Sequence, residues 1–118
     1  MSNSTLAVRI LPETERSLAF GGISGAYAPV GTPLGHAAVN IVFQNLTAGI
    51  VNFSWDGINP WMTFAAGASF VLDIQSNKGR SDALLGAAGT QFYVRQTTAP
   101  VSGAVYISVL YGANFDNL

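Results

Sequence analysis

The sequence has no cysteine, few charged side chains and no long apolar run. Without cysteine, disulfides and thiolate metal sites are excluded. No apolar stretch approaches the roughly 18 residues of a membrane-spanning helix. The first residues, MSNSTLAVRIL, lack a basic segment followed by an apolar one, which a signal peptide needs. We therefore expect synthesis in a cytoplasm, without export and without a membrane partner.

Charge is scarce: the chain has five basic and six acidic residues among 118, for a net charge of −1. An average composition would give about 30 charged residues. The densest charged stretch, SNKGRSD at 76–82, is too weak an electrostatic footprint for nucleic acid. A near-zero net charge also removes the repulsion that keeps copies apart. The composition predicts a homo-oligomer, or a protein that works inside a larger assembly.

Catalytic chemistry is also sparse. The one histidine, His36, lies in a glycine- and proline-rich stretch that is poorly suited to hold a catalytic triad. We expect His36 to be either a turn residue or a packed residue whose ring is half exposed. Glu13 and Glu15 lie beside Arg16 in the sequence, and we expect solvent-exposed ion pairs between them in a hairpin turn. The sequence thus predicts that the protein is not an enzyme.

Asp56 and Asn59 flank an Asp-Gly reversal and could supply two oxygens to calcium, but that ion takes six or more. An Asx-turn, in which the aspartate bonds its own backbone, is the favoured interpretation. We expect no metal and no cofactor.

Apolar residues recur with a period of two, which is typical of half-buried strands. The pattern predicts seven or eight short strands in one domain, 1–118, folded as an all-β antiparallel β-sandwich or jelly roll. Phe53 and Trp55 share one strand face and are expected in the core. The expected strands cover 6–11, 16–20, 39–43, 50–56, 69–75, 91–95 and 104–111, with a weak short strand at 61–64.

Residues 21–38, GGISGAYAPVGTPLGHAA, contain five glycines, two prolines and no acid or base. Such a length is unusual for a structureless loop in a compact domain. Two interpretations stay open: a mobile surface loop, or an arm that orders on a neighbouring subunit.

Several apolar side chains exceed what one small core can bury. Both faces of the last strand are apolar, and a short aromatic segment follows Pro60. These residues are candidates for a protein interface: Trp61, Met62, Phe64, Tyr27, Tyr106 and Leu110.

From Ala38 to Gly112 the layout resembles a group of small virion proteins of tailed bacteriophages. The matching pieces occur in order, and they are VNIVFQN, IVNFSWDGI, AAGASFVLDI with a following SNK, GTQFYVRQ, a Pro-x-Ser-Gly turn and GAVYISVLYG. The resemblance covers about 75 residues and excludes the first 37. It implies a β-sandwich subunit of the phage particle, present in several copies and without catalysis.

The resemblance and the composition together predict a non-catalytic capsid decoration or cement subunit located in the virion. Its partners would be the major capsid protein, or neck and tail proteins if it is instead a head-tail junction, collar or tail-fibre-base protein. A different class, a carbohydrate-binding β-sandwich module, is motivated by Trp61 and Tyr27 as sugar-stacking rings.

Overall fold

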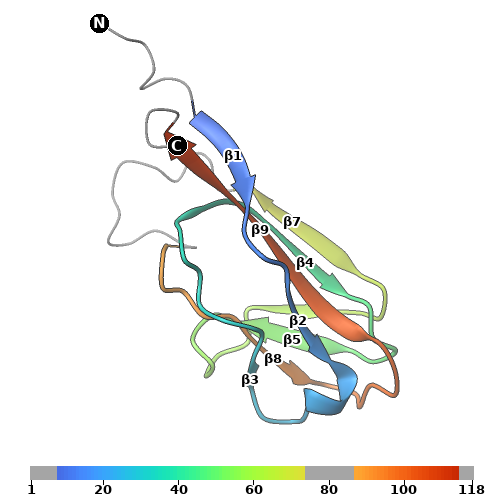
Figure 1. Ribbon diagram of the computed structural model, residues 1–118. Coiled ribbons are helices and arrows are strands. Elements are labelled where there is room, and N and C mark those ends of the chain that lie inside the picture. Colours follow the sequence, from blue (N-terminus) through green and yellow to red (C-terminus); the bar gives the residue numbers. More distant parts are fainter. Residues whose placement is uncertain (1–7, 74–86, 115–118) are drawn as a thin grey trace, which may run out of the picture.

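The alternating apolar pattern produces a series of short strands in the computed structural model, which describes residues 8–73 and 87–114. The fold is an all-β antiparallel sandwich, as predicted (Figure 1). Its strands are β1 (Val8–Pro12), β2 (Arg16–Ala19), β3 (Ala28–Pro29), β4 (Ala38–Asn45), β5 (Val51–Ser54), β6 (Met62–Phe64), β7 (Ser69–Asp73), β8 (Tyr93–Gln96) and β9 (Ala104–Asn114). The predicted strand at 6–11 and the charged stretch at 76–82 lie partly or wholly outside the described residues.

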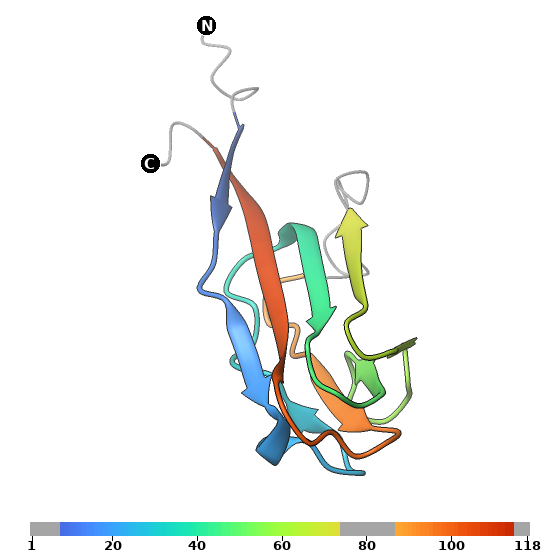
Figure 2. The ribbon, with the colours of Figure 1, turned by 90° about the vertical axis from the view of Figure 1, so that its right-hand side faces the viewer.

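The strands divide into two sheets. A five-stranded sheet runs β1-β9-β4-β7, with β2 also paired to β9, and a four-stranded sheet runs β3-β8-β5-β6. Apart from the pairs β1–β2 and β5–β6, which each stay in one sheet, successive strands alternate between the sheets in the order of a jelly roll. Figure 2 shows β9, β4 and β7 side by side, with β1 and β2 end to end along the other edge of β9.

The expected hairpin between the first two strands is wrong. Leu11 of β1 pairs with Tyr111 of β9, and Leu18 of β2 pairs with Val105 of the same strand. The chain therefore keeps its direction through residues 13–15 and bends there without reversing. This bend places Glu13 and Arg16 against the segment 31–36, where the polar cluster described below is built.

The core lies between the two sheets and is centred on Phe43. The ring of Phe43 meets those of Phe53, Phe92 and Trp61 with centroids 5.4, 5.2 and 4.8 Å away. Edge-to-face and tilted pairs of this kind add to the free energy gained from apolar burial. The buried hydrophobic residues are Ile23, Val30, Leu34, Ala38, Ile41, Phe43, Val51, Phe53, Phe64, Phe92, Val94, Val105, Ile107 and Val109.

Segment 21–38 packs on the chain's own core. It contains a 3-10 turn at Phe20–Gly22 and the short strand β3, which pairs with β8. Ile23, Val30 and Leu34 are buried, and the backbone N–H of Val30 donates to the carbonyl of Phe92. Neither interpretation left open by the sequence foresaw this packing, because three apolar residues spaced among glycines give no periodic signal.

Asn45 joins the two sheets where β4 leads into β5. Its fully buried side-chain amide donates to the carbonyls of Gly49, Phe64 and Ala65 at 2.9 to 3.1 Å. Its Oδ1 accepts from both the backbone N–H and the hydroxyl of Thr47. One side chain thus satisfies backbone groups from two segments of the chain, the loop after β4 and the end of β6.

The loops after Asn45 and before β9 both require glycine, for different reasons. Gly103 adopts a positive φ of 84°, which side chains other than glycine rarely allow. Gly49 is not among the described residues with positive φ. Glycine is needed there because a Cβ would lie 2.5 Å from the carbonyl oxygen of Thr98.

In the described ranges, no helix is long and apolar enough to cross a membrane.

Candidate functional site

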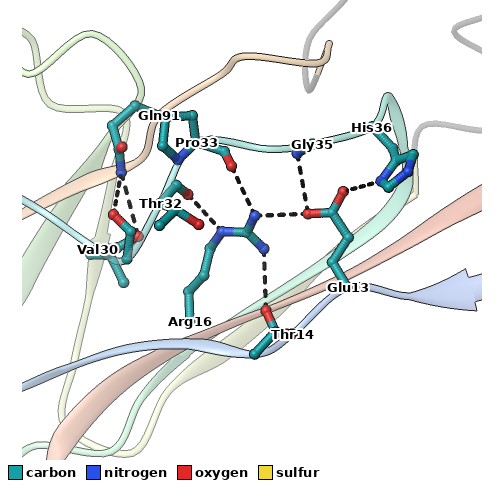
Figure 3. A network of polar contacts seen from close by, with 10 residues as sticks. Glu13, Thr14, Arg16, Val30, Thr32, Pro33, Gly35, His36 and Gln91 are labelled. Atoms are coloured by element: carbon teal, nitrogen blue, oxygen red, sulfur yellow. Dashed lines mark hydrogen bonds and ion pairs between the residues drawn. The ribbon is translucent and has the colours of Figure 1, made fainter.

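Three surface regions of the described chain gather chemically distinctive side chains. They are a polar cluster around Glu13, a tryptophan pocket after β5, and the outer face of the five-stranded sheet. The polar cluster is drawn in Figure 3.

Arg16 is held by hydrogen bonds from every nitrogen of its guanidinium. Nε donates to the carbonyl of Thr32 at 2.7 Å, Nη1 to that of Thr14, and Nη2 to that of Pro33 and to Oε1 of Glu13. The Arg16–Glu13 contact is 2.7 Å long, and the two side chains are only 7% and 8% exposed. The expected solvated pairing is therefore wrong for Glu13, because the bend folds it under segment 31–36 (Figure 3).

The second oxygen of Glu13 orients His36. Nδ1 of His36 lies 2.6 Å from Oε2 of Glu13, and the half-exposed imidazole stacks on the ring of Tyr111 at 3.7 Å and 2°. Burial raises the pKa of Glu13, but hydrogen bonds from His36, Arg16 and Gly35, together with the Arg16 charge, outweigh burial and leave that pKa below its usual value. The half-exposed ring predicted for His36 is confirmed.

An open pocket of about 680 Å³ lies beside this cluster. A carboxylate-oriented imidazole could act as a base if a nucleophile faced its free nitrogen. In the part of the chain that the structure describes, no hydroxyl is hydrogen-bonded to Nε2 of His36. Within the same residues, no group of three or more histidine and acidic side chains is arranged to hold a metal ion.

The tryptophan pocket forms where β5 ends at Ser54. Trp55 follows that end, so its indole leaves the strand face and lies 4.7 Å from the indole of Trp61, inclined by 52°. The expectation that Trp55 is a core residue is wrong, since 39% of it is exposed, whereas Phe53 is buried as expected. A small cavity of about 150 Å³ is lined by Trp55, Asp56, Asn59, Pro60 and Trp61.

Asp56 shapes the rim of this pocket through an Asx-turn, as predicted. Its Oδ1 accepts from the backbone N–H groups of Ile58 and Asn59 at 2.8 Å and from the Ser54 hydroxyl. The backbone N–H groups of Asn59 and Ile58, then the side chains of Ser54 and Asn59, hold the pKa of Asp56 well below its usual value. Gly57 completes the turn with a φ of 74°.

The outer patch is the region of the five-stranded sheet that faces away from the core. Strand register aligns Val71 with Val42 and Val42 with Ser108, and the next rows bring Tyr106 and Leu110 beside them. We define the outer patch as Val42, Val71, Tyr106 and Leu110. Val71 is 56% exposed and Leu110 is 36% exposed, although both lie on strands whose other face is packed.

The six interface candidates fall in different environments. Leu110 and Tyr106 belong to the outer patch, and Trp61 and Met62 are half-buried against the core. Phe64 is wrong as an interface residue: its ring is buried 5.0 Å from that of Phe53. It points inward because β6 pairs with β5 in the register Val51↔Phe64.

Tyr27 and Trp61 do not form one platform for a sugar. Tyr27 precedes β3, at one edge of the four-stranded sheet, and lies under the guanidinium of Arg95 at 4.7 Å from the ring centroid. Trp61 precedes β6, at the opposite edge, and its ring packs on Phe43. The Trp55–Trp61 pocket was not foreseen, because the alternation assigned Trp55 to the core.

Comparisons with known proteins give only a distant structural similarity. No family model matches the chain, and no curated protein matches it. Among solved structures, it is similar to the cupin_2 domain of an XRE family transcriptional regulator from Enterobacter cloacae. The sequence identity is 16% and the TM-score 0.39, with 89% of this chain and 96% of that chain covered.

These findings correct the predicted function. The matching structure is a domain of a transcriptional regulator, not a tailed-phage structural protein, and no family model or curated relative supplies a phage protein. The role as a capsid decoration, head-tail or fibre-base subunit is therefore withdrawn. The comparisons test neither oligomeric state, nor enzymatic activity, nor location, and those three stay predictions.

Proposed function

We propose that this chain is a non-enzymatic assembly subunit that associates with a second copy of itself through the outer patch. The observation that carries the proposal is the exposure of Val71 and Leu110 on a sheet whose inner face already packs against the other sheet. In a two-fold interface, the outer patch of one copy faces the same patch of the other copy. The apolar side chains of the two patches would then bury each other.

Charge supports a second copy as the occupant. The chain carries a net charge of −1, so two copies repel each other very little. The described acidic residues at the margin of this face are Glu15, which accepts a hydrogen bond from the Ser108 hydroxyl, and Asp73 at the end of β7. Glu15 borders the row of Val71, Val42 and Ser108, and Asp73 ends the row of Leu110 and Asn40 at the sheet edge. A two-fold contact centred on Val42 would leave both carboxylates at its margin.

The area of the outer face of the five-stranded sheet determines how stable a dimer we expect. Four adjacent strands at a spacing of about 4.8 Å, along an eight-residue strand such as β4, give a face of about 500 Å². Two such faces bury about 1,000 Å², at the lower end of specific interfaces. We therefore expect a reversible dimer whose population depends on concentration.

Sedimentation across a concentration series tests this proposal, with Val71→Asp as the disruptive variant. Val101→Asp is the matched control, because Val101 is 74% exposed in the loop before β9 and lies off the sheet. We expect Val71→Asp to shift the mass to that of the monomer and Val101→Asp to leave the dimer intact. A monomer at every concentration, or equal effects of the two variants, would contradict the proposal.

The Glu13 cluster supports the non-enzymatic part of the proposal. Both oxygens of Glu13 are engaged, one by Arg16 and one by His36, which ties the bend at residues 13–15 to segment 31–36. This is an arrangement that fixes a loop in place. A hydrolase substrate screen checks it: turnover that His36→Ala abolishes would show that the pair is catalytic.

A further inference from the structure

The tryptophan pocket combines two indoles with a carboxylate that has no cationic partner among the described residues. Ser54, Ile58 and Asn59 supply the hydrogen bonds to Asp56, and all of these donors are neutral. The ion pairs of Glu13 with Arg16 and His36 lie at the other site. The pocket is therefore lined by one carboxylate and two electron-rich indole rings.

The two indoles are held differently. Trp61 is fixed from behind, where its ring packs edge-on against Phe43 at 4.8 Å and against Phe70 at 6.4 Å. Trp55 packs against the Trp61 ring and is partly exposed to solvent. The Asx-turn then sets Asp56 and Asn59 at the rim. The site is thus largely formed before any ligand arrives, which limits the ordering cost of binding.

The volume of the tryptophan pocket limits its ligand to a small chemical group. A cavity of about 150 Å³ is well below the roughly 300 Å³ at which pockets for drug-sized ligands begin. A water molecule occupies about 30 Å³ in the liquid, so the cavity has room for about five heavy atoms. That is the size of a nitrogen with four attached carbons.

The hydrogen bonds that the polar groups of the pocket already make favour a cation over a neutral sugar as the ligand. A sugar needs donors and acceptors with spare capacity to bond its hydroxyls. Here Oδ1 of Asp56 already accepts three hydrogen bonds, and the amide of Asn59 donates to Oδ2 of the same carboxylate. A methylated ammonium needs only negative charge and ring faces, because it has few or no N–H groups to satisfy.

We propose that the Trp55–Trp61 pocket binds a methylated ammonium group, the head group shared by choline and by trimethyl-lysine. Trp55 and Trp61 would supply cation–π contacts, and Asp56 would supply the compensating charge. This inference is independent of self-association through the outer patch.

Intrinsic fluorescence tests the proposal directly, because the chain has two tryptophans and both line the pocket. Choline chloride and a peptide carrying trimethyl-lysine are the two ligand arms, which separate a free small molecule from a modified protein as the source. Sodium chloride at matched ionic strength and 3,3-dimethylbutanol, the uncharged analogue of choline, are the controls. We expect a saturable change with at least one ammonium ligand and none with either control.

Two variants of pocket residues test whether the ammonium ligand binds in the tryptophan pocket. Trp55→Ala should weaken ammonium binding about 2- to 30-fold, the range for the loss of one cation–π contact. Asp56→Asn keeps an acceptor for the turn but removes the charge, and it should also weaken binding. Phe20→Ala is the matched control, because Phe20 is an aromatic residue of similar exposure, 41%, in the 3-10 turn after β2. Circular dichroism confirms that each variant is folded.

Three results would overturn the proposal. The first is an equal response to choline and to its uncharged analogue, since charge would then play no part. The second is unchanged affinity in both folded pocket variants. The third is saturable binding of a neutral sugar in place of the ammonium ligands. A native chain that stays monomeric at every concentration but still binds an ammonium ligand would refute the proposed function alone, so the two failures are distinguishable.

Discussion

Replacing Asn45 with aspartate should destabilise the fold strongly with almost no change in volume. In the native chain, the Asn45 amide donates to the carbonyls of Gly49, Phe64 and Ala65, and its oxygen accepts from Thr47. Aspartate keeps the acceptor but removes both N–H groups. Three carbonyls then lose their donor and face a carboxylate in a site with no solvent exposure.

The magnitude follows from these contacts. Each lost hydrogen bond lowers the free energy of unfolding by about 1 kcal/mol, so the three amount to about 3 kcal/mol. Burial of an unpaired carboxylate adds to this loss. Since the whole domain is expected to be stable by about 5–15 kcal/mol, Asn45→Asp should remove a large share of its stability.

Urea unfolding followed by circular dichroism measures this effect, with Gln44→Glu as the matched control. Gln44 precedes Asn45 on β4, its side chain is on the outer face, and the change from amide to carboxylate is the same. In dilute protein, we expect Gln44→Glu to change the free energy of unfolding by less than about 0.5 kcal/mol. The Asn45→Asp penalty should shrink as the pH falls, because the protonated acid regains one donor. A loss below about 1 kcal/mol for Asn45→Asp would refute the assignment of Asn45 as the link between the sheets.

Two further predictions concern the backbone and the polar cluster. Gly103→Ala should destabilise the fold by more than about 1 kcal/mol in thermal unfolding, because φ is 84° there and a Cβ would overlap the carbonyl of Leu46. Gly21→Ala, which meets nothing within 4 Å, should be nearly neutral, and similar losses for both would argue against the turn geometry. The lowered pKa of Glu13 means that its carboxylate stabilises the fold above its ordinary value of 4.5, and that this contribution is lost as the pH falls through the folded value. Glu13→Gln should therefore flatten the acid side of a stability–pH curve, and an unchanged acid side would contradict the assignment.

The strands were largely predictable because one face of each sheet is buried and the other is not. Ile41 and Phe43 point inward on β4 while Val42 points outward, so the sequence carries the period-two signal. The short strand β3 was missed, since Ala28 and Pro29 are too few to show any period and proline is uncommon within strands.

The sites were less predictable, because they depend on where strands end and which segments meet. Trp55 continues the alternation of Val51 and Phe53, yet β5 ends at Ser54 and the Asx-turn redirects the next residue. The burial of Glu13 depends on segment 31–36 folding over the bend, a contact between residues about 20 positions apart that no local pattern contains. Sequence composition did point to excess apolar surface, and the apolar faces of the last strand identified Tyr106 and Leu110 of the outer patch, but not Val42 and Val71 on the neighbouring strands.

The two proposed surfaces lie on different parts of the fold, and this has a consequence for how they would act together. The outer patch belongs to the five-stranded sheet, whereas the tryptophan pocket follows β5 and precedes β6 of the other sheet. A dimer formed through the outer patch would therefore leave both pockets open to solvent. Two pockets on one such dimer would gain affinity for a target that displays several ammonium groups, because the second contact would form at high effective concentration. The proposed self-association would then serve binding as well as assembly.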